Sequence, residues 1–411
     1  MSLLARNIAS LGVLQVAGYA IALASVPLLT RVLGVHGFGE FVLTQAAMRY
    51  CVLVVDFGFL WSATQKIAAA RGGEDQVSMI FSRTWVLQWV LLVIVGALLA
   101  ILFASVPELR RNFWLGVSGF SMVIGSAAAP TWLLLGLERM KAVAISQSLA
   151  NLLALGLLVL FVRGPEHVGL ALVIYGGALA LANVILTLWI FRQGFVRWIV
   201  PSCMELVVTA REALPVFAST IFVSFYTVLP SLALGLLASA TAVAYFNVAD
   251  KARSAATSVM QPALTALLPR MSHLFVHDRD RARTLLGCSI SVTAGVSGAA
   301  SIALFLFAEE IVSIVGGSSF IPAAKVLKWM SPLPFVVCMS SVASLQVLLP
   351  DGKVSQFNRV LIVAGAISFA AVWPFVNLGA EFGAAQCLLL TEILVCVAMW
   401  RFAVPTVLRK H

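Results

Sequence analysis

Residues 240–269 read ATAVAYFNVADKARSAATSVMQPALTALLP, an almost uncharged stretch that is interrupted near its middle by Asp250, Lys251 and Arg253. The stretch is long enough to cross a bilayer, since a membrane-spanning helix needs about 20 predominantly apolar residues. Ionisable groups at that depth are costly unless they face a water-filled cavity or one another. The stretch therefore indicates a polytopic membrane transporter whose ligand carries charge, and its basic side chains favour a negatively charged ligand.

The whole chain has the composition of a membrane protein. It is 61% hydrophobic and 11% charged, with a mean hydropathy of +1.02, whereas soluble domains carry about 25% charged residues. Apolar stretches recur from end to end and predict an all-α fold of about twelve transmembrane helices. These stretches are residues 8–30, 41–65, 84–106, 113–135, 142–162, 168–191, 213–238, 241–269, 284–307, 324–349, 358–379 and 382–402.

Lysine and arginine are distributed unevenly among the expected loops. With a cytoplasmic N-terminus, eighteen of the 27 basic residues fall on the cytoplasmic side and six on the other, which is the positive-inside bias of membrane proteins. The remaining three, Arg49, Lys251 and Arg253, lie inside expected spans. The bias predicts that both termini are cytoplasmic, and it accounts for the formal charge of +10 without a nucleic-acid partner.

The chain reads as two similar halves. The polar stretch at 192–212 lies at the midpoint and is interpreted as a linker between two six-helix lobes, residues 1–195 and 196–411. The sequence LLLGLER at 133–139 is echoed by VLLPDGK at 347–353, which indicates a weak internal repeat. Two parallel lobes of this kind suit alternating access around a central site.

Polar side chains on the first, second, seventh and eighth expected spans should turn away from lipid and line a common chamber. Those of the eighth span recur at the spacing of one helical face. The candidate cavity residues are Gln15, Asp56, Thr220, Ser224, Thr227, Asp250, Thr257 and Gln261. The candidate ligands of an anionic group are Arg49, Lys251 and Arg253.

Structural roles remain open for several of these residues. Asp250 can neutralise Arg253 as an i, i+3 pair, and Asp56 can pair with Arg49 or Lys66. The Ser/Thr stripe of the seventh span is typical of helix packing and of hydroxyls that bond to their own helix. A purely structural network should balance its charges, whereas three basic and two acidic residues leave one positive charge in excess. This excess favours an anionic ligand.

Signatures of catalysis, metal binding and nucleotide binding are absent from the sequence. The histidines form no zinc-protease pattern, the six cysteines are scattered singly, and no glycine-rich phosphate loop occurs. We therefore expect no enzyme activity, no catalytic residue, no metal and no cofactor. The tryptophans mostly lie near the expected span ends, as in an aromatic belt at the membrane interface.

Several segments, taken in their order along the chain, are similar to one bacterial transporter family. They are residues 7–15, PLLTRVLGVHGFG at 27–39, DFG at 56–58, WLLLGLERMK at 132–141, ADK at 249–251, Pro262 and LPR at 268–270. Together they cover most of the chain and resemble the polysaccharide flippases of the O-antigen type. That family belongs to the multidrug, oligosaccharidyl-lipid and polysaccharide exporter superfamily.

The resemblance implies a two-lobe, V-shaped helical transporter of the bacterial inner membrane. It would move a polyprenyl-pyrophosphate-linked oligosaccharide, an O-antigen or exopolysaccharide repeat unit, from the cytoplasmic to the periplasmic leaflet. Arg49, Lys251 and Arg253 would hold the pyrophosphate oxygens. The implied partners are this substrate, membrane lipids and a polysaccharide polymerase. A multidrug or cation antiporter of the same superfamily is the alternative, with Asp56 and Asp250 as its acidic candidates.

Overall fold

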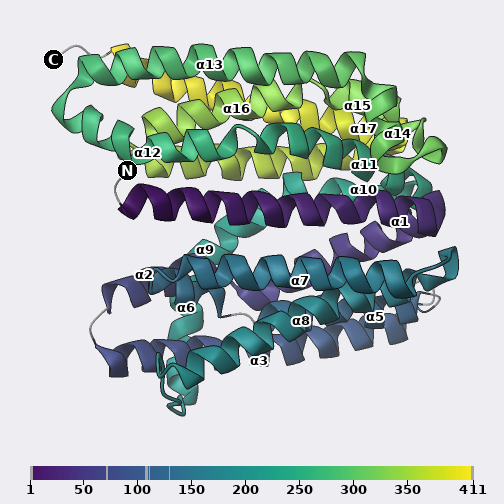
Figure 1. Ribbon diagram of the computed structural model, residues 1–411, viewed down its shortest axis with the longest axis horizontal. Coiled ribbons are helices and arrows are strands. Elements are labelled where there is room, and N and C mark those ends of the chain that lie inside the picture. Colours follow the sequence, from purple (N-terminus) through teal and green to yellow (C-terminus); the bar gives the residue numbers. More distant parts are fainter. Residues whose placement is uncertain (1–2, 71–72, 107–109, 111, 129, 409–411) are drawn as a thin grey trace. The chain divides into compact units, whose positions relative to one another are not determined.

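The described part of the chain is helical, as the sequence predicts. The structure is a computed structural model that describes residues 3–70, 73–106, 110, 112–128 and 130–408; within these ranges, side chains are described for residues 24–405 except residue 276. No β-strand occurs within the described ranges (Figure 1). Helices satisfy every backbone hydrogen bond within one segment, which a lipid environment requires.

The chain divides into two compact units, Met1–Ile221 and Phe222–His411. The first contains α1 (Leu3–Asp56), α2 (Phe59–Ala69), α3 (Glu74–Ser105), α5 (Phe113–Ala127), α6 (Thr131–Gly136), α7 (Met140–Phe161), η1 (Pro165–His167) and α8 (Val168–Arg192). The second contains α10 (Leu229–Leu237), α11 (Ala240–Ser258), α12 (Gln261–His277), α13 (Arg279–Leu306), α14 (Ala308–Gly316), η2 (Ser318–Phe320), α15 (Ala323–Met330), α16 (Leu333–Ala343), the π-helix η3 (Ser344–Leu348) and α17 (Val354–Leu408). Residues of α9 (Cys203–Thr227) fall in both units.

Nine helical segments of the described residues are long and apolar enough to cross a membrane. Two of them, Ala24–Ala69 and Val354–Pro405, have 46 and 52 residues and contain non-helical breaks at Gly34 and Ala380. The expected eighth span is not among the nine, because the 19-residue α11 contains the charged turn and α12 has only 17 residues. The all-α membrane fold is therefore confirmed, and the number of twelve spans stays a prediction.

Close backbone contact joins the helices of the first unit. α5 packs along α8, and a β-carbon built on Gly176 of α8 would lie 2.5 Å from the backbone nitrogen of Met122 in α5. Across the same contact, Asn183 Nδ2 donates to the carbonyl oxygen of Gly125 at 2.9 Å. Small residues and side-chain-to-backbone hydrogen bonds are the usual means of helix association in membranes, where lipid is as apolar as the helices.

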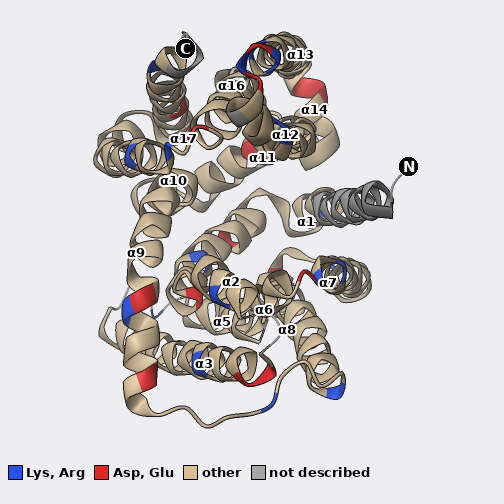
Figure 2. Cartoon of the chain, turned by 90° about the vertical axis from the view of Figure 1, so that its left-hand side faces the viewer, with Lys and Arg blue, Asp and Glu red and all other residues tan. Residues whose placement is uncertain are grey.

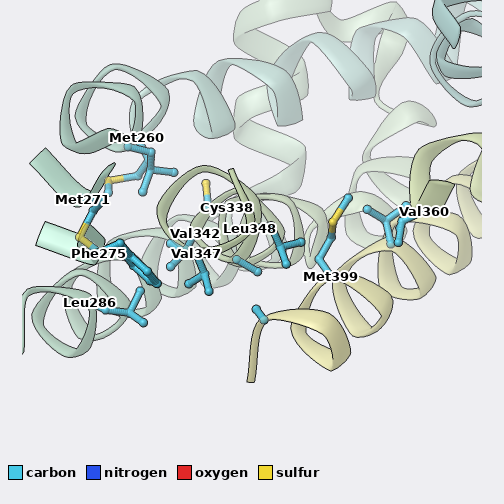
Figure 3. Close-up of a cluster of buried hydrophobic side chains, with 14 of the residues drawn as sticks. Met260, Met271, Phe275, Leu286, Cys338, Val342, Val347, Leu348, Val360 and Met399 are labelled. Carbon is cyan, nitrogen blue, oxygen red and sulfur yellow. The ribbon is translucent and has the colours of Figure 1, made fainter. Parts of the chain in front are cut away.

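The second unit has its own apolar core (Figure 3). α16 packs against α13 and α17, and α12 contacts η3. Figure 3 shows Met260, Met271 and Phe275 beside Val342 and Val347, and all five residues are buried. α17 contributes Val360 and Met399 to this core, and α11 packs against α16 and α17.

The two echoed sequences, LLLGLER and VLLPDGK, fold into the same turn. Arg139 N donates to the carbonyl oxygen of Leu134 at 2.7 Å, and Lys353 N donates to that of Leu348 at 2.9 Å. The residue before each donor is left-handed, with φ of 57° at Glu138 and 74° at Gly352. The shared hydrogen bond and backbone are what an internal repeat predicts, with glycine in the copy where a left-handed residue costs least.

Adjacent glycines of α8 provide a test of the α5–α8 contact. Gly176→Ala should overpack it and lower the free energy of unfolding by about 1–3 kcal/mol. Gly177→Ala is the matched control, because a β-carbon there meets nothing within 4 Å. It should be neutral or slightly stabilising. The midpoint of thermal unfolding in detergent measures both effects, and equal midpoints for the two variants would refute this packing.

Candidate functional site

Charged residues are sparse on the helices, as Figure 2 shows, and α11 concentrates three of them within four positions. The helix begins at the N-cap Ser239, whose Oγ accepts a hydrogen bond from Ala242 N at 3.1 Å. From this start it runs without interruption through Asp250, Lys251 and Arg253. The charged turn thus lies in the interior of a regular helix, where side-chain direction follows from the helical repeat.

Asp250 and Arg253 form an ion pair. Arg253 Nε and Nη2 donate to Asp250 Oδ1 at 2.9 and 2.7 Å, and Nη2 also donates to Ser254 Oγ at 2.9 Å. Their side chains are 28% and 15% exposed, so water screens the pair only in part. The pairing that the sequence left open is therefore present. Nη1 of Arg253 donates no hydrogen bond to any described residue.

Arg49 and Lys251 differ from Arg253 in both exposure and pairing. Both are exposed, and neither has a carboxylate of the described residues within 4.0 Å. Arg49 interacts electrostatically, at longer range, with Asp56 and Tyr175. These two cations are therefore the ones that keep their charge available on the surfaces of their units.

Glu392 of α17 is a charged residue that the sequence reading missed. It interacts electrostatically with Arg253 of α11 and with Tyr226 of α9. Counting Glu392, the charges that lie away from the ends of the expected spans are three basic and three acidic, so the predicted excess of one positive charge is wrong. A single acid in the apolar run TEILVCV at 391–397 does not disturb the hydropathy pattern, and charge counting within the last expected span is the signal that would have found it.

Asp56 ends the second helical half of α1, just before a left-handed break at Phe57 and Gly58. Ser126 Oγ of α5 donates to Asp56 Oδ1 at 3.2 Å. Lys66, one of the two suggested partners of Asp56, instead forms an ion pair with Glu212. The break and the serine, rather than a lysine, therefore fix the position of this carboxylate.

The predicted Ser/Thr stripe mostly bonds to its own helices. Thr220 and Thr227 Oγ1 donate to the carbonyl oxygens four residues earlier, at 2.8 and 3.1 Å, and Thr257 does the same at 3.1 Å. Gln261 Nε2 donates to Ser341 Oγ at 3.4 Å and so links α12 to α16. Helix packing and back-bonding thus account for these groups. Ser224 is buried, and Gln15 lies outside the described side chains.

Comparison with known families assigns the chain to one of them. A family model described as "Polysaccharide biosynthesis protein" matches residues 4–275. The chain belongs to this family. A relative from Escherichia coli (strain K12) named "Putative O-antigen transporter" is 32% identical over 399 residues, which are 97% of this chain and 96% of the relative. A protein of the same name from Shigella dysenteriae is 27% identical over 394 residues, 96% and 98% of the two chains.

Solved structures share the fold of this polysaccharide biosynthesis protein. An inward-facing multidrug resistance MATE family transporter of the MOP superfamily superposes with a TM-score of 0.71 at 14% identity, over 94% of this chain and 98% of the other. The lipid II flippase MurJ, in an inward closed conformation, gives a TM-score of 0.75 at 12% identity, over 96% and 87%. At these identities the likeness shows a common polytopic transporter fold.

The ion pair of α11 predicts a non-additive effect on stability. Asp250→Ala and Arg253→Ala each leave a charged partner behind, and each should lower the free energy of unfolding by about 1–3 kcal/mol. The double variant should lose less than the sum of the two. Lys251→Ala, the neighbouring control, should stay within about 0.5 kcal/mol. Thermal unfolding of the purified protein measures all four, and strictly additive losses would contradict the pairing.

Proposed function

We propose that this protein is a flippase of lipid-linked oligosaccharide. It moves a polyprenyl-pyrophosphate-linked repeat unit of O-antigen or exopolysaccharide from the cytoplasmic to the periplasmic leaflet by alternating access. Full-length similarity to relatives named as O-antigen transporters supports the substrate class. The observation that carries the proposal is the presence on apolar helices of two exposed cations, Arg49 and Lys251, that form no ion pair with any described residue.

A cation in the middle of an apolar helix needs water or an anion. Facing lipid, Arg49 or Lys251 would be strongly unfavourable, because the hydrocarbon offers neither hydration nor a counter-charge. A diphosphate supplies several oxygens that accept charge-assisted hydrogen bonds from guanidinium and ammonium groups. We therefore assign Arg49 and Lys251 to the anionic headgroup, with Arg253 adding its Nη1 group.

Glu392 and Asp250 set the strength of this site. Asp250 forms an ion pair with Arg253 and Glu392 interacts with it electrostatically, so the charge of that guanidinium is partly balanced before a ligand arrives. Binding of the headgroup then depends mostly on the exposed cations. A site with part of its charge already balanced releases an anion more readily than an unscreened cationic cluster, which a transporter needs at the end of each cycle.

The location follows from the same proposal. The protein lies in the inner membrane with both termini in the cytoplasm, as the positive-inside bias predicts. The repeat unit that it delivers carries an activated pyrophosphate linkage on the periplasmic side. A polysaccharide polymerase is the expected consumer of that product.

Deleting the gene should remove the surface glycan and cause lipid-linked repeat units to accumulate in the cytoplasmic leaflet. In complementation, Arg49→Ala and Lys251→Ala should each lower the surface glycan at least about tenfold, since each removes about 1.4 kcal/mol or more of headgroup binding. Arg49→Lys and Lys251→Arg should keep most of it. Glycan is measured on gels and protein abundance on blots of the same cells.

Arg281→Ala is the matched control, because the Arg281 side chain is 82% exposed and, among the described residues, pairs only with Asp278 of its own turn. It should complement fully. Unchanged surface glycan after deletion would reject the flippase. Increased drug sensitivity, together with loss of ion-driven efflux in Asp250→Asn, would instead identify the multidrug or cation antiporter.

A further inference from the structure

Residues 195–212, which we call the strap, comprise the segment between α8 and α9 and the beginning of α9, and they lie in the polar stretch that the sequence predicts as a linker. α8 ends in a turn where Gly194 is left-handed (φ 69°) and Phe195 N donates to the carbonyl oxygen of Ile190 at 3.3 Å. This turn directs the following residues back along the first unit. The strap then forms specific contacts with α2 and α3, which a free tether would not make.

Two buried serines of α3 hold the backbone of the strap. Ser78 Oγ accepts from Arg197 N at 2.9 Å, and Ser82 Oγ accepts from Ile199 N at 3.1 Å. Both serines are 1% exposed. Four residues of helix advance about 6 Å and two residues of extended chain about 6.6 Å, so the spacing of the serines matches that of alternate amides. Undocking would leave two hydroxyls in an apolar site without these partners.

Side chains of the strap pack into the same region of the first unit. Val196 is 3% exposed within the cluster formed by α2, α3 and α6. Trp198 meets Trp85 of α3 edge to face, with 5.8 Å between ring centroids, and the Arg139 guanidinium lies 5.2 Å from the centroid of Phe195. Trp85 and Trp198, two members of the predicted aromatic belt, thus contact each other.

Ion pairs extend the attachment into α9. Ser202 N donates to Glu205 Oε2 at 2.8 Å and Glu205 N to Ser202 Oγ at 3.4 Å, a reciprocal cap that starts the helix. Glu205 also pairs with Arg83 of α3, and Glu212 pairs with Lys66 of α2. Beyond these pairs, Phe217 of α9 stacks on Phe57 beside Asp56, with centroids 4.3 Å apart. The first half of α9 is thus attached to the first unit by two ion pairs and by one aromatic stack.

We propose that the strap stays docked on α2 and α3 throughout the conformational cycle. Residues 195–217 then move as part of the first unit, and their attachment holds α9 against the helix break that positions Asp56. The segment between the predicted lobes is accordingly a positioning element of the first unit. This inference concerns the chain alone and does not depend on which substrate is transported.

A disulfide between the strap and α3 tests whether transport requires the strap to dissociate. Ser82→Cys and Ile199→Cys place a cysteine pair at the second docking point, in a background with the exposed Cys203 and Cys288 replaced by serine. After a pulse of oxidant, cross-linked cells should make new surface glycan within about twofold of reduced cells. The single-cysteine variants control for the oxidant. A tenfold or larger loss that a reductant reverses would show that the strap releases, and would overturn the proposal.

Hydrogen exchange gives a second reading that needs no transport substrate, so it separates failure of this inference from failure of the flippase proposal. The amides of Arg197 and Ile199 should exchange as slowly as the interior of α3, and Ser78→Ala with Ser82→Ala should speed their exchange at least about tenfold. Ser297→Ala is the control, because this buried serine bonds within its own helix. Fast exchange in the unmodified protein, or no change in the double variant, would refute the docked strap.

Discussion

A charge carried into the hydrocarbon layer by a helix must meet water or an opposite charge, and this requirement organises the charged residues of both units. Asp250 and Glu392 act on Arg253, and Ser126 holds Asp56. Each of these contacts satisfies a group locally, within one unit. The charged residues therefore form two groups. One group interacts with partners within its own unit, and a smaller group of exposed cations keeps its charge available for a ligand.

The hydropathy pattern predicts the helical membrane fold well, because composition alone determines which segments prefer lipid. It predicts the helix breaks only in part. Gly34 and Ala380 lie in the gaps between expected spans, whereas the Phe57–Gly58 break lies inside one. Breaks depend on local backbone geometry and packing, which are weak signals in a single sequence. For this reason the number of spans is harder to predict than the class of fold.

The candidate site is likewise predictable from the sequence only in part. Periodicity within one helix predicts the Asp250–Arg253 pair, since i, i+3 neighbours must lie close together. Contacts between distant segments leave no such pattern: the Ser126–Asp56 bond joins residues 70 apart, and the Ser78–Arg197 bond joins residues 119 apart. Counting charges in the last expected span locates Glu392, but its interaction with Arg253 on another helix leaves no pattern in the sequence. Only folding brings these groups together.

Helical geometry then explains how neighbouring cations acquire different roles. Lys251 and Arg253 are two positions apart, and successive residues turn by about 100°, so their side chains leave α11 in directions about 200° apart. Arg253 therefore reaches Asp250 one turn back and interacts electrostatically with Glu392 of α17, whereas Lys251 forms no ion pair with the described residues and stays exposed. One turn of helix thus provides one cation held in an ion pair and one exposed cation. A lysine one position later, in place of the buried Ala252, would lose this exposure and leave the turn without an exposed cation.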